Sequence, residues 1–371
     1  MNVFSRLPDS YRLNIPSTYS LPLYSPQLTG GTELRRAGSD MSQLSFSITE
    51  MSQVGQVRRE AIRLAQHSGL NEVCVGKVAL IATELGTNLV KHATAGQLLM
   101  RVSEFDEGKC IELLFLDRGP GMADVSTCMV DGYSTAGSPG TGLGAVARIA
   151  DQFNIYSQVK NGTVAVARIV SGRKAPAIGV VHQPKHGESI CGDAWLVKEY
   201  DGRTLCVVAD GLGHGPLAAT AAMAIIQALN SRLSLRTPSE VIGVAHQAAT
   251  STCGASLGVA ILNPDAQEVR FAGVGNVSAM VITGTIRNHL VSCSGVVGHE
   301  YRKLTEFSQS LSKESIFVMH SDGFSERWDL SRYPGLGTKD PSLLAGILYR
   351  DFSRPHDDKT VIIISLRGLY F

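Results

Sequence analysis

The sequence has almost no net charge and no long run of apolar residues. Among its 371 residues, 34 Lys and Arg are balanced by 33 Asp and Glu, which leaves a formal net charge of +1. That balance gives no electrostatic reason to expect nucleic acid or an anionic membrane as a partner. No uninterrupted apolar run approaches the ~20 residues that span a bilayer. No apolar segment follows Arg6 and Arg12, so we expect no secretory signal.

Paired cysteines are also missing. The seven cysteines are scattered without a CxxC pair, and most lie inside apolar segments. Thiols in such positions behave as small, reduced core residues. The sequence therefore predicts a protein of the reducing cytoplasm.

The length and a hydrophobic content of 44% predict two domains, each with its own core. Residues 1–42 are rich in Pro, Ser, Tyr and Leu and show no period. We expect an irregular extension there, with docking onto a partner or onto the rest of the chain as the alternative. The first domain is predicted at 43–172, a linker at 173–184, and a β-rich second domain at 185–371.

Apolar residues at helical spacing predict two long helices early in the first domain. We expect one at 51–68 and one that begins at the N-cap Asn71 and runs to residue 92. Neighbouring strands are expected after them, and Asn161-Gly162 is a strong hairpin pair between two strands. A glycine-rich stretch at 119–144 leads into a further helix.

Polar residues in this domain form a pattern suited to a nucleotide. Glu84 and Asn88 lie four residues apart, on one face of the second helix. By themselves they would more often be a solvated polar patch. However, Asp117 ends an apolar strand and could accept a hydrogen bond from an adenine amino group. The glycine loops and the helix after them offer backbone N–H groups to phosphates.

These residues resemble those of the ATPase fold shared by gyrase, histidine kinases and bacterial anti-sigma kinases (the GHKL fold). ELGTN is similar to its N-box, and DRGPGM and GTGLGA to its two glycine boxes. The run DGYSTAGSPGTGLGA looks most like the RsbT-type switch serine kinases. No histidine-bearing pair of dimerisation helices precedes the domain, which argues against a sensor histidine kinase.

The resemblance implies an ATP site with one Mg²⁺ ion. Glu84 would be the catalytic base, Asn88 the Mg²⁺ ligand and Asp117 the adenine contact. The nucleotide loops would contain five glycines, Gly119, Gly121, Gly140, Gly142 and Gly144.

In the second domain, aspartates stand alone at four strand ends. Asp193 precedes an apolar strand, Asp210 ends LCVVAD, Asp322 ends IFVMHSD, and Asp357 and Asp358 precede KTVIIISL. Any one of them would usually be a turn residue. Four together predict that these aspartates lie close to one another. Their like negative charges would then need divalent cations to balance them. Because the ligands are oxygens without a Cys or His cluster, Mg²⁺ or Mn²⁺ is favoured over zinc.

This pattern resembles the metal-dependent protein phosphatases of type 2C (PPM), and among them the bacterial RsbX and SpoIIE branch. The resemblance implies that Asp210 and the Gly211 carbonyl bridge two metal ions. Asp193, Asp322 and Asp357 would be further ligands, with Asp358 a neighbour. No arginine near Asp193 corresponds to the phosphate-gripping arginine of eukaryotic members. His214 is interpreted as a turn residue, with contact to phosphate as the alternative.

The predicted fold class is α+β, a GHKL-type α/β sandwich followed by a PPM-type αββα sandwich. The predicted function is a bifunctional partner-switching protein, a Ser/Thr kinase and metal-dependent phosphatase acting on STAS-type antagonist or scaffold proteins. Nucleotide or partner binding at the lid, 122–140, is expected to shift the balance between the two. One alternative makes the ATP domain a non-catalytic module that captures a sigma factor or switch protein. A second makes the phosphatase domain degenerate.

Overall fold

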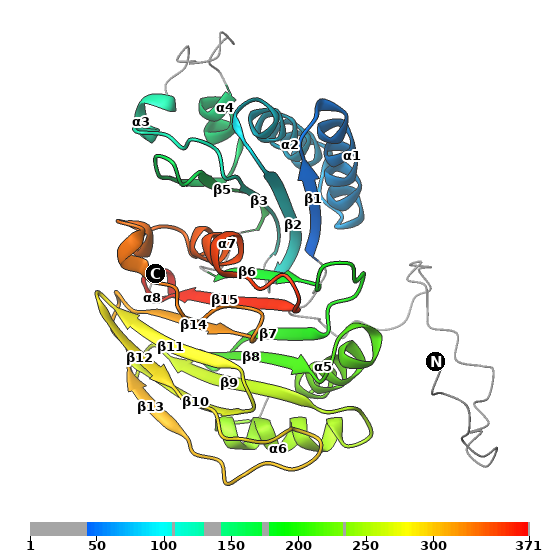
Figure 1. Ribbon diagram of the computed structural model, residues 1–371, viewed down its shortest axis with the longest axis vertical. Helices are drawn as coiled ribbons and strands as arrows, with labels where there is room; N and C mark the ends of the chain where they lie inside the picture. The colour runs from blue at the N-terminus through cyan, green and yellow to red at the C-terminus, as the bar shows by residue number, and fades with distance from the viewer. Residues whose placement is uncertain (1–42, 106–107, 130–141, 173–177, 233–234, 370–371) are drawn as a thin grey trace, which may run out of the picture. The chain divides into compact units, whose positions relative to one another are not determined.

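The first domain is a five-stranded antiparallel sheet with helices on one face. In the computed structural model (Figure 1), the described residues are 43–105, 108–129, 142–172, 178–232 and 235–369. The predicted extension at 1–42 lies outside them. The sheet order is β1-β2-β3-β5-β4. Its strands are β1 (Gln43–Ile48), β2 (Gly96–Phe105), β3 (Gly108–Leu116), β4 (Gln152–Ser157) and β5 (Thr163–Ser171).

The predicted helices of this domain are confirmed within one or two residues. They are α1 (Met51–His67), α2 (Glu72–His92) and α4 (Gly142–Ile149), with a short α3 (Val125–Cys128) before the last. The side chain of Asn71 accepts from Cys74 N, so the expected N-cap of α2 is present. By length and composition α2 could also cross a membrane. Its apolar face packs into the domain core instead, through Val78, Ile81, Leu85 and Leu89.

The second domain consists of two packed five-stranded sheets with helices outside them, which confirms the predicted αββα sandwich. One sheet has the order β13-β10-β9-β8-β7 and is covered by α5 and α6; the other has the order β12-β11-β14-β15-β6 and is covered by α7. The helices are α5 (Gly215–Asn230), α6 (Pro238–Ala249), α7 (Pro341–Phe352) and α8 (Leu366–Leu369). The strands are β6 (Ile178–Gln183), β7 (Asp193–Tyr200), β8 (Arg203–Gly211), β9 (Ala255–Asn263), β10 (Glu268–Val274), β11 (Ser278–Thr283), β12 (Ile286–Leu290), β13 (Phe307–Ser310), β14 (Ile316–His320) and β15 (Lys359–Ser365).

Strand β6 lies inside the segment predicted as a linker. Residues Ile178–Gln183 pair with β15 in an antiparallel ladder, and all six are buried. A short apolar run among Gly, Pro and Lys shows no period, so the local sequence predicts an irregular segment here. Its strand conformation is fixed by pairing with β15, where Gln183 lies opposite Lys359 and Ile178 opposite Ile364. That distant partner is not evident from local sequence.

The sheet of the first domain and α7 of the second share one hydrophobic core. Helix α7 packs on β6 and β15 and also on β3 and β5, as Figure 1 shows. A single buried cluster includes Leu114 and Val164 from the first sheet and Leu343, Leu344 and Leu348 from α7. Eight consecutive residues of α7, Pro341–Leu348, are buried. Its first two turns are therefore enclosed on all sides, and periodicity within this buried run did not predict the helix.

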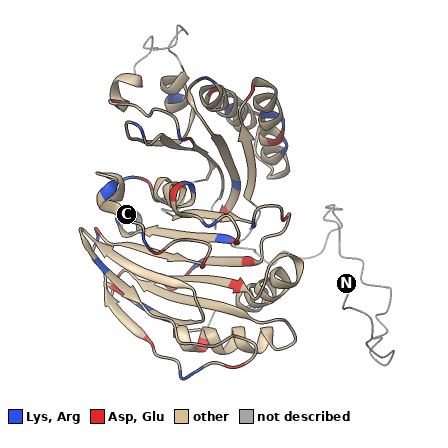
Figure 2. Cartoon of the chain, viewed as in Figure 1, with Lys and Arg blue, Asp and Glu red and all other residues tan. Residues whose placement is uncertain are grey.

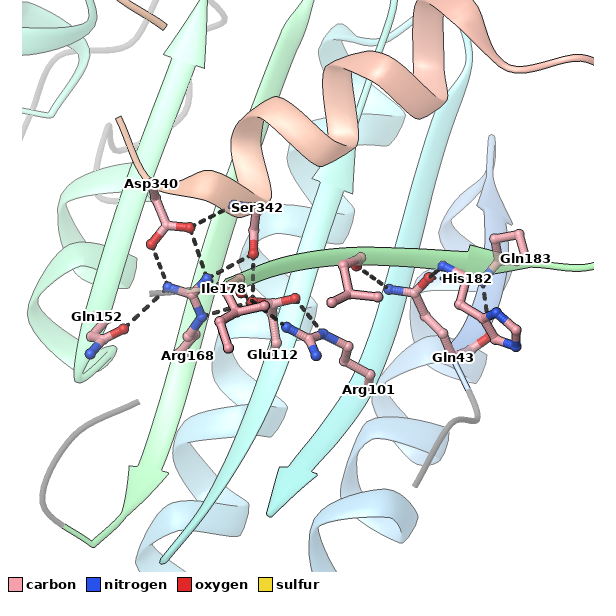
Figure 3. A network of polar contacts seen from close by, with 11 residues as sticks. Gln43, Arg101, Glu112, Gln152, Arg168, Ile178, His182, Gln183, Asp340 and Ser342 are labelled. Carbon is pink, nitrogen blue, oxygen red and sulfur yellow. Dashed lines mark hydrogen bonds and ion pairs between the residues drawn. The ribbon is translucent and has the colours of Figure 1, made fainter. Parts of the chain in front are cut away.

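A buried ion-pair network joins the first sheet to the start of α7 (Figure 3). Glu112, on β3, accepts hydrogen bonds from Arg101 Nε at 2.8 Å and from Arg168 Nε at 2.7 Å. Arg168 Nη2 donates to Asp340 Oδ1, the N-cap of α7, at 2.8 Å and to Ser342 Oγ at 2.8 Å. Ser342 Oγ in turn donates to Glu112 at 2.8 Å. The buried charges are therefore paired and hydrogen-bonded, as burial requires.

We expect Glu112→Gln to lower the free energy of unfolding by about 3 kcal/mol near neutral pH, because the buried guanidinium group of Arg101 loses its carboxylate and that of Arg168 keeps only Asp340. Burial acts to raise the pKa of Glu112, but Arg101 and Arg168 outweigh it and lower the pKa to about 2. The stabilisation is therefore complete above about pH 4.5 and is lost as the pH falls toward about 2. Urea denaturation across this range measures both effects.

The matched control is Glu104→Gln, which removes an exposed ion pair with Lys109 and should change stability by less than about 1 kcal/mol. A difference between wild type and Glu112→Gln that stays constant from neutral to acid pH would contradict the assignment of this charge to folding stability.

Candidate nucleotide site and metal centre

The two polar residues of α2 lie directly against the start of α4. A β-carbon on Gly142 would stand 3.4 Å from Glu84 Oε2 and 3.5 Å from Asn88 Nδ2. Gly142 is the first residue of α4, where backbone N–H groups have no partner within the helix. The second glycine box and the predicted N-box residues are therefore brought together. Glu84, Asn88 and the N-terminus of α4 therefore lie close together, with both side chains at van der Waals distance from that β-carbon position.

Asp117 is held at the end of β3 by the neighbouring backbone. Its Oδ1 accepts from Gly119 N at 2.7 Å and from Thr163 N at 3.2 Å. Burial raises the pKa of Asp117, and these hydrogen bonds act against that rise by favouring the carboxylate. A β-carbon on Gly119 would stand 2.6 Å from the carbonyl oxygen of His92. Only glycine fits there, so the first glycine box lies against the end of α2.

The remaining predicted glycines fall in different places. Gly121 has φ +68 and a β-carbon on it would stand 2.1 Å from Gln158 O, so this turn requires glycine. Gly144 is buried within α4. Gly140 and most of the predicted lid lie outside the described residues. The first domain thus brings together α2, the first glycine box and α4, in the arrangement that a nucleotide with its Mg²⁺ would need.

Strand pairing places the first two predicted metal ligands side by side. Asp193 begins β7 and Asp210 lies near the end of β8, and the antiparallel register puts them opposite each other. Acidic positions at these strand ends are visible beside α5 in Figure 2. A β-carbon on Gly211 would stand 2.1 Å from Ala218 O. The chain can pass α5 this closely only because residue 211 is a glycine.

The other two predicted ligands, Asp322 and Asp357, and their neighbour Asp358 come from the facing sheet. Asp322 follows β14, Asp357 and Asp358 precede β15, and these two strands are antiparallel neighbours. Ser321 ties the two sheets together at this end, since its Oγ donates to Asp193 Oδ2 at 2.7 Å and accepts from Thr360 N at 3.0 Å. The sandwich therefore gathers all four predicted strand ends at one edge.

The electrostatics of the cluster fit a cation. Burial, followed by the charges of Asp358 and Asp322, raises the pKa of Asp193 to about 7. Burial and then Asp193 raise the pKa of Asp210 to about 9. Carboxyl groups so disposed favour the neutral form unless positive charge is added. Asp193 Oδ1 is a buried oxygen without a hydrogen-bond partner, which a metal or its water would satisfy.

Within the described residues, no three Asp, Glu, His or Cys side chains converge closely enough to hold an ion by themselves. The strand-end acids offer oxygen donors, the ligand type that Mg²⁺ and Mn²⁺ take.

The predicted neighbour Asp358 has a backbone partner. Its Oδ1 accepts from Lys185 N at 2.8 Å, and the residue is buried. His214 Nδ1 lies 3.0 Å from Glu188 Oε1. This contact joins the loop before Asp193 to the loop after Asp210.

Sequence reasoning missed two polar residues of the centre. Ser321 bridges the sheets, and Asn276 donates to Asp322 Oδ2 at 2.6 Å. Ser321 could have been found as the residue before a strand-end acid. Asn276 belongs to a glycine-rich turn between β10 and β11, and nothing in its local sequence points to Asp322.

Comparison with known proteins divides the chain in the same way. The family described as "Histidine kinase-like ATPase domain" matches residues 48–169, and "Stage II sporulation protein E (SpoIIE)" matches residues 200–367. The serine/threonine-protein kinase RsbT of Bacillus subtilis (strain 168) is 31% identical over 100 residues, 27% of this chain and 75% of RsbT.

Phosphoserine phosphatase RsbX of the same organism is 30% identical over 142 residues, 38% of this chain and 71% of RsbX. A crystal structure of RsbX in complex with magnesium is 26% identical, with a TM-score of 0.45, and covers 50% of this chain and 92% of that one.

Proposed function

Because the chain belongs to the RsbT-like kinase family in its first domain and to the SpoIIE and RsbX phosphatase family in its second, we propose that it both adds and removes phosphate on a protein partner. The observation that carries this proposal is that one chain contains both sets of residues, each gathered in its own domain. Glu84 and Asn88 face the start of α4, and Asp193 lies opposite Asp210.

In the phosphatase domain, Asp210 with the Gly211 carbonyl, Asp193, Asp322 and Asp357 would hold two Mg²⁺ or Mn²⁺ ions. Bound ions would supply charge stabilisation at the phosphoryl oxygens of the substrate. Ser321 orients the carboxylate of Asp193, and Asn276 that of Asp322. The close approach of Gly211 to Ala218 fixes the backbone that links the end of β8 to α5. These contacts pre-organise the acids on rigid strands.

In the kinase domain, ATP would supply the transferable phosphoryl group. Asn88 would hold Mg²⁺ through its side-chain oxygen. Asp117 would bind the adenine, and the N-terminal N–H groups of α4 would bind phosphate. Glu84 would accept the proton of the attacking Ser or Thr hydroxyl.

The protein partners proposed are small antagonist or scaffold proteins of the STAS type, or a sigma factor. Opposed activities on one chain would form a futile cycle unless one is favoured. We propose that nucleotide or partner binding at the lid, 122–140, provides that bias. Dephosphorylation of a phosphorylated partner at one rate, with or without ATP and partner protein, would refute this regulation.

A second function keeps the phosphatase and makes the first domain a module that captures a partner without phosphoryl transfer. The RsbT-like sequence of this domain is compatible with either. Incubation with labelled ATP and a candidate antagonist protein separates them. The capture module predicts that no labelled protein appears and that Glu84→Ala binds the partner as wild type does. Labelling that depends on Glu84 would exclude it.

An apolar rim beside the metal centre, formed by Ile190, Leu212 and Leu217, supports a protein substrate. Ile190 lies in the loop before Asp193, Leu212 directly follows the end of β8, and Leu217 lies in the first turn of α5. Their exposed fractions are 43%, 46% and 77%. They are three of nine exposed large hydrophobic residues among those described. Apolar groups exposed at a catalytic site are typical of contact with a protein.

We expect Leu217→Asp to lower the rate of phosphoprotein dephosphorylation by about tenfold, because losing one well-buried apolar contact costs about 1–2 kcal/mol. Hydrolysis of p-nitrophenyl phosphate should be unchanged, since that substrate is too small to cover the rim. The control is Ile286→Asp, an exposed apolar residue on β12. Equal loss with both substrates would show that Leu217 supports the site itself.

A further inference from the structure

Helix α7 of the phosphatase domain ends at the nucleotide site of the first domain. Arg350, in its last turn, has only 7% of its side chain exposed. Its Nη1 donates to the backbone carbonyl oxygen of Asp117 at 2.8 Å. The residue assigned to adenine is therefore contacted by a residue from the other domain.

A second pair of contacts crosses the same boundary. Arg118 Nη1 lies 3.1 Å from Asp351 Oδ1, and Arg118 Nη2 donates to the carbonyl oxygen of Arg350. Asp351 Oδ2 also accepts from Arg350 Nη2 at 2.7 Å and from Tyr333 Oη at 2.9 Å. An arginine of each domain thus donates to a backbone carbonyl oxygen of the other domain. The carboxylate of Asp351 contacts both guanidinium groups.

The backbone of Asp117 is fixed on several sides. Asp117 N donates to Thr163 O at 2.9 Å, and a β-carbon on Gly162 would stand 2.1 Å from Asp117 O. The hairpin between β4 and β5 therefore encloses the carbonyl from one direction, while Arg350 binds it from the second domain. The positive charge of Arg350 also opposes the rise that burial causes in the pKa of Asp117. Both effects favour an ionised, correctly oriented carboxylate.

We propose that Arg350 is a positioning residue of the nucleotide site, through which the phosphatase domain completes adenine recognition in the kinase domain. This inference rests on the proposed function, because it assumes that Asp117 contacts the base. A purely structural Arg350 would affect binding of all nucleotides alike. A positioning role affects the base contact, because adenine presents an amino donor where guanine presents an oxygen.

The test compares binding of fluorescent mant-ATP and mant-GTP to the full chain with Mg²⁺. We expect Arg350→Met to weaken ATP binding by about tenfold, the scale of a lost hydrogen bond to a charged group, with GTP binding little changed. Arg350→Lys, which keeps the charge and one donor, should recover part of the preference for ATP. Arg236→Met, which removes an exposed ion pair with Asp201, is the matched control and should bind both nucleotides as wild type does.

The possible outcomes distinguish a failure of the role proposed for Arg350 from a failure of the proposed nucleotide site. Wild-type protein that binds no nucleotide would overturn both. If wild type prefers ATP over GTP and Arg350→Met keeps the same preference, the role of Arg350 would be overturned but the nucleotide site would not. Equal weakening of ATP and GTP in that variant would also overturn it, because Arg350 would then only support the fold. A selective loss of ATP binding supports it.

Discussion

Replacing Asp210 by asparagine is expected to lower metal-dependent dephosphorylation of a phosphoserine protein by about a thousandfold, the effect of losing several kcal/mol of charge stabilisation. Asp210 lies opposite Asp193 on paired strands and is surrounded by the charges of the other acids. Asparagine keeps the shape of the side chain but supplies no negative charge to a divalent cation. The measurement is phosphate release from a phosphoprotein with and without Mn²⁺ or Mg²⁺.

A thermal shift adds a reading that does not depend on turnover. Mn²⁺ should raise the melting temperature of wild type, because a ligand that binds only the folded state stabilises it. It should have little effect on Asp210→Asn. Asp201→Asn is the matched control, since Asp201 is an exposed residue at the turn of the same β7–β8 hairpin. Full activity of Asp210→Asn at ordinary metal concentrations would contradict the proposed metal centre.

The second large effect is expected at Glu84. Glu84→Gln should lower phosphoryl transfer to a protein substrate by about a hundredfold to ten-thousandfold, the usual contribution of a general base. ATP binding should remain, because Asp117 and the glycine loops are unchanged. Single-turnover transfer from labelled ATP measures the first quantity and mant-ATP binding measures the second.

Glu72→Gln is the control for this experiment, because Glu72 lies in the first turn of the same helix. It should lose less than about 1 kcal/mol of helix stability and no activity. Transfer at the wild-type rate by Glu84→Gln would remove Glu84 from the chemistry. Loss of ATP binding together with transfer would assign Glu84 to the nucleotide instead.

Most of the architecture could be predicted because its elements have a regular period. The helix from residue 72 to residue 92 has apolar residues on one face and an Asn N-cap, and the strands of the second domain are apolar runs bounded by turns. The strand-end acids could be predicted as a cluster because Asp193, Asp210 and Asp322 each stand at one end of an apolar strand, next to a glycine. A common site for these acids is the simplest explanation of several like charges at strand ends.

The elements that join the two domains could not be predicted in this way. Helix α7 is buried on all sides over Pro341–Leu348, and β6 is a short strand within a segment rich in Gly and Pro. Arg350 reaches Asp117 across 233 positions in the sequence. Local propensity and motif spacing carry no information about such a contact, which depends on how two complete domains pack together.

The central claim is that one chain both adds and removes phosphate, and an Asp210→Asn variant tests it most directly. Wild type, Asp210→Asn and Glu84→Gln are each incubated with labelled ATP, Mg²⁺ and Mn²⁺ and a STAS-type antagonist protein, and labelled antagonist is followed over time. We predict that label accumulates most in Asp210→Asn, stays lower in wild type because it is removed again, and is absent in Glu84→Gln. Equal labelling by wild type and Asp210→Asn, or no labelling by either, would contradict the claim.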